Sequence, residues 1–193
     1  MNEKQSIALV KIGHPEHLDK LIHSKSPRVR WHIAQRGTDS HRDKLVNDTD
    51  ENVREQVAKY GNDSHKDRLL HDKDPDVRTE IATRGNDSHR DKLINSKEPT
   101  VRRAIARYGS DSHRDKLIKD KDEEVRSYVA QFGNDSHREK LIKDKNPNVR
   151  RNVARYGNDN HRDRLRNDKD YYVKRIVSAP KVSYDEDDDN VYE

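Results

Sequence analysis

The sequence of 193 residues contains no cysteine. This absence excludes disulfide bonds, zinc sites with thiolate ligands and iron–sulfur clusters held by cysteine. No apolar run approaches the roughly 18 residues that a helix needs to cross a bilayer, and the first residues do not have the pattern of a signal peptide. We therefore expect a soluble protein located in the cytoplasm.

Apolar residues are also scarce. They make up 28% of the sequence, whereas charged residues make up 40%, a balance that is usual in disordered chains. A conventional globular core is therefore not expected. A linear stack of repeats remains possible, because each unit of such a stack needs only a thin apolar seam shared with its neighbours.

Glycine is rare and strictly periodic. The seven glycines recur every 24 residues, at Gly13, Gly37, Gly61, Gly85, Gly109, Gly133 and Gly157. One histidine, one leucine and one valine of each unit keep the same period, as in His65, Leu69 and Val77. A fixed period of this length predicts a solenoid in which every unit buries its apolar face against the next.

The repeat divides the chain into four parts. We expect a capping helix and half-repeat over residues 1–25, six complete repeats over 26–169, a closing half-repeat over 170–178 and a disordered acidic tail over 179–193. The tail contains six acidic residues and one lysine, while the whole chain carries a net charge of +4. A basic body therefore carries an acidic tail.

Each repeat shows the start and stop signals of a helix of about ten residues. Asp74 suits the N-cap and Pro75 the first helical position, where the missing N–H costs nothing. Arg84 would end this helix, and Gly85 follows at the place of a left-handed residue after the C-cap. The pattern predicts the longer helix of the repeat.

A second, shorter helix is expected to begin at Ser88. Ser88 and Asp91 have the spacing of a capping box, with Asp in place of the usual Glu. Leu93 and Ile94 would supply the apolar side chains that pack beneath the first helix.

The segment DKDPDVRTEIATRGNDSHRDKLIN (72–95) and its copies over 26–169 resemble the leucine-rich repeat variant family. They are also similar to the broader HEAT-like class, in which an acid and a Val-Arg pair recur. The resemblance implies an all-α fold, a right-handed α-solenoid of 24-residue two-helix repeats in which an α-helix alternates with a short α or 3₁₀ helix. Two features of those families are missing. The cysteine-ligated cluster of some variant-repeat proteins is excluded, and Trp31 with the scattered acids does not reproduce the catalytic pocket of HEAT-like DNA glycosylases.

Several polar residues recur in every unit and invite a functional reading. The histidines would lie about 8–10 Å apart in neighbouring units, too far for two imidazoles to share one zinc ion. We interpret each ring as structural, packed against the next repeat or hydrogen-bonded at the turn between helices.

The arginine after each core valine, such as Arg78, would pair with the acid four residues earlier, such as Asp74, and tie units together. A row of phosphate-binding arginines is the alternative.

The second helix carries two further basic rows with an acid between them. One row is Arg42, Lys66, Arg90, Arg114, Arg138 and Arg162, and the other is Lys44, Arg68, Lys92, Lys116, Lys140 and Arg164. Alternating charge is typical of a solvated face, and exposed pairs contribute typically below ~1 kcal/mol each. These rows are a weak signal for nucleic-acid binding.

Positions that differ between units are the better candidates for function. On the first helix two variable positions four residues apart share one face, and the residue before each glycine from Gly37 to Gly157 is Arg, Tyr or Phe. The candidate partner-binding residues are Trp31, Arg103, Arg107, Arg151, Arg155, Arg175, Tyr108 and Tyr156. Arginine interleaved with aromatics suits either a protein interface or single-stranded nucleic acid, and the tyrosines alternatively cover gaps between repeats.

We predict no catalytic residue, no metal site and no cofactor. Every Asp, His or Ser that could form a catalytic group recurs in six or seven copies, whereas an active site is one special arrangement. The preferred function is a non-enzymatic protein–protein interaction scaffold that acts as a monomer, with no membrane and no small-molecule substrate. The alternative is a nucleic-acid-binding HEAT-like solenoid that uses Arg103, Arg107, Arg151, Arg155 and Arg175, with the acidic tail as competitor. A modular enzyme inhibitor is a third, weaker hypothesis, and the tail alternatively serves as an acidic binding motif or only as a solubilising segment.

Overall fold

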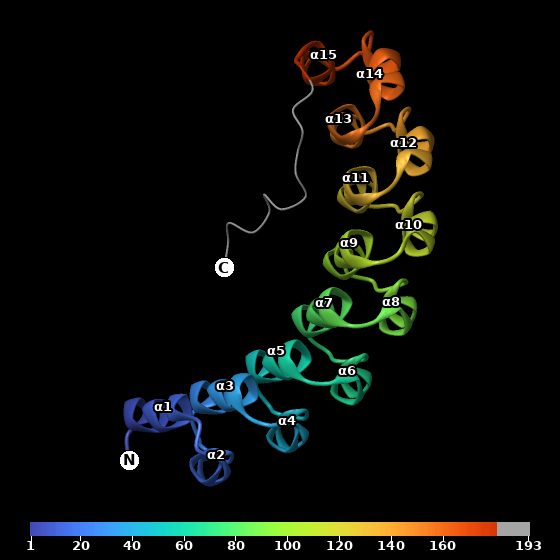
Figure 1. Cartoon of the computed structure of the whole chain (residues 1–193). Coiled ribbons are helices and arrows are strands. Elements are labelled where there is room, and N and C mark those ends of the chain that lie inside the picture. Colours follow the sequence, from blue (N-terminus) through green and yellow to red (C-terminus); the bar gives the residue numbers. More distant parts are fainter. Residues whose placement is uncertain (181–193) are drawn as a thin grey trace. The chain divides into compact units, whose positions relative to one another are not determined.

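The computed structural model describes residues 1–180, which form fifteen helices and no β-strand (Figure 1). The chain divides into two compact units, Met1–Gly109 (unit 1) and Ser110–Glu193 (unit 2). Long helices alternate with short ones throughout both units. The fold is therefore an α-solenoid of two-helix repeats, as the sequence predicts. The acidic part of the expected tail, residues 181–193, lies outside the described residues.

The helix bounds follow the repeat. The long helices are α1 (Glu3–Ile12), α3 (Pro27–Arg36), α5 (Glu51–Tyr60), α7 (Pro75–Arg84) and α9 (Pro99–Tyr108) in unit 1, and α11 (Glu123–Phe132), α13 (Pro147–Tyr156) and α15 (Tyr171–Ser178) in unit 2. The short helices are α2 (Pro15–Leu21), α4 (Asp39–Leu45), α6 (Asp63–Leu69) and α8 (Asp87–Leu93) in unit 1, and α10 (Asp111–Leu117), α12 (Asp135–Leu141) and α14 (Asp159–Leu165) in unit 2.

Two layers of helices form each unit. In unit 1 the long helices pack in the order α1, α3, α5, α7 and α9, and in unit 2 α13 packs between α11 and α15 (Figure 1). The short helices form the second layer and contact the long helices beside them. The apolar seam runs between the layers: Val53, Val57 and Ala58 are fully buried, and Leu69 is 3% exposed. Five or six apolar residues per repeat suffice because every repeat covers the next.

The predicted start of the long helix is confirmed. Asp74 is the N-cap of α7, its carboxylate accepts a hydrogen bond from the Asp76 N–H at 2.8 Å, and Pro75 occupies the first helical position. Asp50 caps α5 in the same way through the N–H groups of Asn52 and Val53. The caps satisfy N–H groups that have no partner within the helix.

The predicted start of the short helix is wrong by two residues. The N-cap of α8 is Asn86 rather than Ser88, and its box partner is His89 rather than Asp91. The Asn86 side chain accepts from the His89 N–H at 3.1 Å, while His89 Nδ1 accepts from the Asn86 N–H at 3.0 Å. An unprotonated imidazole nitrogen at this position does the work of the usual Glu side chain, because both are acceptors.

The role predicted for the repeated glycine is also wrong. Gly85 has φ −76°, an ordinary extended conformation, and among the described residues positive φ occurs only at Gly13, with φ 79°. Glycine is required at 85 by space. A Cβ atom there would lie 2.5 Å from the Ile81 carbonyl oxygen and 2.9 Å from His89 Nδ1. The glycine therefore makes room for the capping histidine.

Candidate binding surface

The repeated histidines are part of the scaffold. His65 is 1% exposed, its Nδ1 accepts a hydrogen bond from the Asn62 N–H at 3.1 Å, and its Nε2 lies 3.3 Å from Asp43 of the preceding repeat. Because Nδ1 accepts, the ring N–H is at Nε2 and faces that carboxylate. The predicted structural role, a ring hydrogen-bonded at the turn between helices, is confirmed.

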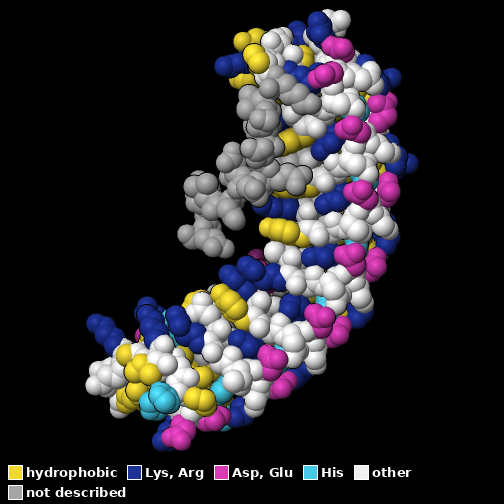
Figure 2. Space-filling view, in the orientation of Figure 1, with side chains coloured by type: hydrophobic (Ala, Val, Ile, Leu, Met, Phe, Trp, Pro, Cys, Tyr) yellow, Lys and Arg dark blue, Asp and Glu magenta, His cyan; other side chains and the backbone are white. Residues whose placement is uncertain are grey.

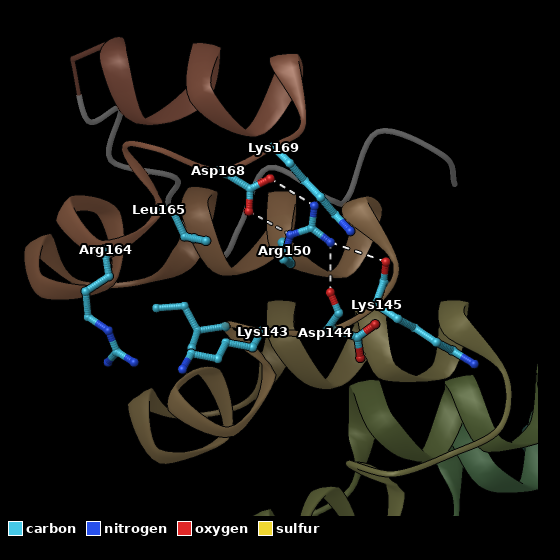
Figure 3. Close-up of a pocket in the computed structure, with 9 residues that line it drawn as sticks. Lys143, Asp144, Lys145, Arg150, Arg164, Leu165, Asp168 and Lys169 are labelled. Carbon is cyan, nitrogen blue, oxygen red and sulfur yellow. Dashed lines mark hydrogen bonds and ion pairs between the residues drawn. The ribbon is translucent and has the colours of Figure 1, made fainter.

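The repeated arginines tie neighbouring repeats together, but through another acid than predicted. Arg150 donates from Nε and Nη2 to Asp168 at 2.7 and 2.9 Å, eighteen residues later in the chain, and from Nη1 to the Asp144 carbonyl oxygen at 2.8 Å (Figure 3). Arg54 pairs with Asp72 in the same geometry. The acid four residues before the arginine instead caps the helix, so the expected pairing of Asp74 with Arg78 is wrong.

One basic row of the short helices is not the solvated face that its alternating charges predict. Arg90 donates from Nε to the Ala82 carbonyl oxygen at 2.9 Å and from Nη2 to that of Thr83 at 3.1 Å, and its side chain is only 11% exposed. It therefore satisfies carbonyl groups at the C-terminal end of α7 that have no helical partner.

The other basic row is exposed, as expected. Lys92 pairs with Asp67 of the preceding repeat at 2.9 Å, and both side chains are about half exposed. Figure 2 shows Lys and Arg side chains alternating with Asp and Glu along the short helices. Positive charges on this layer are thus matched by carboxylates of the neighbouring repeat, which weakens the case for phosphate binding there.

The variable stripe is the surface formed by the candidate partner-binding residues on the long helices. Its predicted members are Trp31, Arg103, Arg107 and Tyr108 in unit 1, and Arg151, Arg155, Tyr156 and Arg175 in unit 2. The equivalent positions of α5 in unit 1, which are Glu55, Lys59 and Tyr60, belong to it as well. Within unit 1, α9 brings three of them together. Within unit 2, α13 carries three and α15 carries the fourth.

Trp31 lines a cavity in unit 1. The half-buried indole packs edge-on against His32, with ring centroids 4.8 Å apart. The cavity has a volume of about 610 Å³, and its wall includes Glu3, Arg28, Asp50 and Asn52. Burial lowers the pKa of His32, helped by nearby cations, so the imidazole is neutral at pH 7. The sequence singles out Trp31 but gives no sign of the cavity or of Asp50 beside it.

Tyrosines on the stripe are exposed next to cations. Tyr108 is 44% exposed, and the Arg107 guanidinium lies 5.2 Å from its ring centroid. Tyr60, one of the aromatic residues before glycine, is 39% exposed and has the Lys59 ammonium 5.6 Å from its ring. Both aromatic rings thus remain accessible after folding, and each has a positive charge over it.

The stripe residues of unit 2 differ in their solvent exposure and in the contacts they make. Arg155 and Arg175 are exposed and Tyr156 is half-buried. Arg151 binds within the fold: its Nε and Nη2 lie 3.2 Å from Asp170 Oδ1, and its guanidinium carbon lies 4.5 Å from the Tyr172 ring centroid. Sequence reasoning missed Asp170 and Tyr172 as neighbours of the stripe, because they come from the following repeat.

The stripe on α5 carries charges of both signs, Glu55 and Lys59. Glu55 occupies the position equivalent to Trp31 one repeat later. Burial raises the pKa of Glu55, and the neighbouring Glu80 and Asp76 raise it further. The stripe thus has Trp31 on α3, a carboxylate and an ammonium group on α5, and arginines on α9, α13 and α15.

Within residues 1–180, no group of three or more His, Asp or Glu side chains is placed to hold a metal ion. Over the same residues, no helix combines the length and the hydropathy needed to cross a membrane. The arrangement of the stripe offers cation–π contacts, hydrogen bonds and charge, which are means of binding a partner.

Comparison with known proteins gives the fold. No protein-family model matches the sequence, and no curated protein matches it. Among solved structures, "a leucine-rich repeat variant with a novel repetitive protein structural motif" aligns with TM-score 0.76 and 22% sequence identity, over 88% of this chain and 72% of that chain.

Two artificial proteins align with lower TM-scores. An engineered protein aligns with TM-score 0.37 and 17% identity, over 91% of this chain and 69% of its own. A designed armadillo repeat protein aligns with TM-score 0.26 and 16% identity, over 90% of this chain and 96% of its own. In fold, the chain is a helical repeat protein similar to the leucine-rich repeat variant.

Proposed function

We propose that this protein is a non-enzymatic scaffold that binds a protein partner through the variable stripe on its long helices, and that it acts in the cytoplasm. The observation that carries the proposal is Tyr108, which remains 44% exposed with the Arg107 guanidinium beside its ring. Tyr, Trp and Arg supply most of the binding energy at protein interfaces. The repeated polar side chains, such as His65 and Arg150, contact the neighbouring repeat and serve the scaffold.

Affinity capture with matched variants tests this function. The immobilised chain would capture its partner, and the variant Tyr60→Ala with Tyr108→Ala is expected to lose it. The matched control is Lys44→Ala with Lys92→Ala, which removes two exposed side chains from the short helices. Direct binding is then measured with the purified partner, and circular dichroism checks that both variants fold. If wild type and both double variants bind the partner equally, the stripe is not part of the interface.

Nucleic-acid binding is the second candidate, favoured by the exposed Arg155 and Arg175. In this alternative Arg103, Arg107 and Arg151 contribute as well, and the acidic tail, which lies outside the described residues, competes for the same surface. Phosphate contacts make binding fall log-linearly with salt. Titration of a labelled single strand at 50 and 200 mM salt, with the chain intact and truncated after residue 180, tests it. The alternative fails if no binding occurs at the lower salt.

A further inference from the structure

The end of the chain shows how the repeat binds a guanidinium. Asp170 caps α15 by accepting from the N–H groups of Tyr172 and Val173, both at 3.0 Å. The same carboxylate accepts from Arg151, whose guanidinium also lies over the Tyr172 ring at 4.5 Å. A carboxylate and an aromatic face thus hold one arginine side chain between two repeats, and the arginine belongs to the chain itself.

The same position in the first complete repeat lacks the arginine. Trp31 stands where Arg151 stands five repeats later, and Asp50 stands where Asp170 stands. Asp50 makes the same cap, accepting from the N–H groups of Asn52 and Val53 at 3.0 and 3.3 Å. Among residues 1–180 no side chain donates a hydrogen bond to it. The carboxylate is therefore present, Asn52 stands where Tyr172 stands, and Trp31 supplies an aromatic ring from the position of the arginine itself. A cavity of about 610 Å³ is lined by Trp31, Asp50 and Asn52.

We infer that this cavity binds an arginine side chain of a protein partner. The inference rests on the proposed scaffold function and specifies what one part of the stripe recognises. The partner's guanidinium would lie against the Trp31 indole and donate to Asp50, as Arg151 does to Asp170. Tryptophan is the best aromatic partner for a cation, and the planar guanidinium both stacks on a ring and donates two hydrogen bonds, which a lysine ammonium does not.

The charges of the cavity wall fit this occupant. Asp50 and Glu3 are acidic, and the Glu3 side chain is 48% exposed. Arg28 is the cation among the lining residues, but it is 73% exposed and leans toward Glu3, with Nη1 at 3.8 Å from Oε1. Lys11 and Arg36 lie outside the lining and act on His32 of the wall. The neighbouring position on α5 is Glu55, another carboxylate of the stripe. A volume of about 610 Å³ is also within the roughly 300–1,000 Å³ of small-ligand pockets.

Fluorescence of the full chain gives a local reading of occupancy, because Trp31 is the only tryptophan. The probe is a tetra-arginine peptide, compared with tetra-lysine and tetra-glutamate at equal ionic strength. Tetra-arginine is expected to change Trp31 emission to a saturating value, tetra-lysine to bind more weakly and tetra-glutamate to have no effect. The inference is overturned if the emission does not respond to tetra-arginine or responds equally to tetra-lysine.

Two variants locate the site. Asp50→Asn removes the charge but keeps a good N-cap residue, and it is expected to weaken tetra-arginine binding by about tenfold or more. Asp170→Asn is the matched control in unit 2, where the chain's own arginine already occupies the place, and it should leave the affinity within about twofold. Equal affinities of wild type and Asp50→Asn would overturn the assignment.

Trp31→Arg provides a further test, with calorimetry as the readout. This variant supplies the missing guanidinium from the chain itself, so it is expected to abolish tetra-arginine binding without a fall in melting temperature. Retained binding would contradict the inference. Failure of the proposed function is a separate outcome: a partner that is still captured by Asp50→Asn and Trp31→Arg leaves the scaffold standing and removes only the arginine pocket.

Discussion

Arg150 and Asp168 meet in two parallel hydrogen bonds of 2.7 and 2.9 Å, although eighteen residues separate them in the chain. Their side chains are 5% and 7% exposed. The Arg150 hydrogen bonds hold the pKa of Asp168 below its ordinary value against the opposing effect of burial. The Arg126–Asp144 pair has the same geometry. A largely buried, bidentate ion pair thus fastens each of these repeats to the next.

Breaking such a pair on one side should destabilise the chain strongly. Asp144→Asn leaves the Arg126 guanidinium buried without its counter-charge, and we expect a loss of about 3 kcal/mol in the free energy of unfolding. The control is Glu98→Gln, because the Arg78–Glu98 pair has a carboxylate that is 37% exposed. Its loss should stay below about 1 kcal/mol. Urea denaturation of both variants measures the difference, and equal losses would show that burial of the pair does not matter.

Two glycine variants separate the effect of space from that of backbone conformation. Gly85→Ala should be strongly destabilising, because its Cβ would lie 2.5 Å from a main-chain oxygen that helix packing holds in place. Gly13→Ala meets no atom within 4 Å, so only its φ of 79° opposes the change. That strain costs roughly 1–2 kcal/mol. Thermal unfolding should rank Gly85→Ala well below Gly13→Ala, and the opposite order would restore the left-handed interpretation of the repeated glycine.

The sequence predicts the helices of each repeat better than it predicts the contacts between side chains. The period, the apolar positions and the Asp74-Pro75 signal give the bounds of α7, because these are local properties of the chain. The sequence favours the wrong start for α8 because Ser88 and Asp91 have the spacing and nearly the residue types of a capping box. Asn86 and His89 have the same spacing, but His is not a usual residue at the second position. A histidine serves as the acceptor there only because the glycine before it lets the ring approach.

Contacts between residues of different repeats could not be predicted from the sequence for a different reason. The pairing of Arg150 with Asp168 depends on how far one repeat is displaced against the next, and the period does not fix that displacement. Spacing within one helix therefore favoured the wrong acid. Trp31 was recognised because it breaks the repeat, but Asp50 matches the repeat pattern, and only the structure shows that both line one cavity.

The capping histidine His41 should make stability depend on pH. Burial lowers the pKa of His41 below 6.5, and the nearby cations Lys44 and Arg42 lower it further while Asp19 opposes them. The folded state therefore binds the proton less well than the unfolded state, so the stabilising contribution is complete above about pH 6.5 and is lost as the pH falls below it. His41→Gln keeps an acceptor at the third helical position and does not titrate.

The measurement is the urea midpoint of wild type and His41→Gln at pH 7.5 and at pH 5.5. We expect the wild-type midpoint to fall more between these two values than that of the variant. His32 remains in both chains and its pKa is also lowered by burial, so the variant should retain part of the pH dependence. Identical falls in the two chains would contradict a titrating cap at His41.

One repeat departs from the others, and its repair should stabilise the chain. Ser96 stands where the preceding repeat has Asp72, and Arg78 reaches instead to Glu98 at 2.6 Å, with Ser96 donating to the same carboxylate oxygen at 2.9 Å. Because Glu98 is engaged there, it does not cap α9, whereas Asp74 caps α7. Glu98 thus pairs with Arg78 but leaves α9 without a side-chain cap, whereas the preceding repeat has Asp72 for the ion pair and Asp74 for the cap.

Ser96→Asp combined with Glu98→Asp restores both contacts, a bidentate partner for Arg78 and an N-cap for α9. We expect a gain of about 1 kcal/mol, which is a rise of roughly 2–4 °C in melting temperature for a chain of this size. The mirror-image variant, Asp72→Ser with Asp74→Glu, should lower the melting temperature, because it imposes the departure on the preceding repeat. Ser96→Asp alone should gain less than the double variant, since it places a second carboxylate beside Glu98. A double variant no more stable than wild type would mean that the Glu98 arrangement is as good as the pair it replaces.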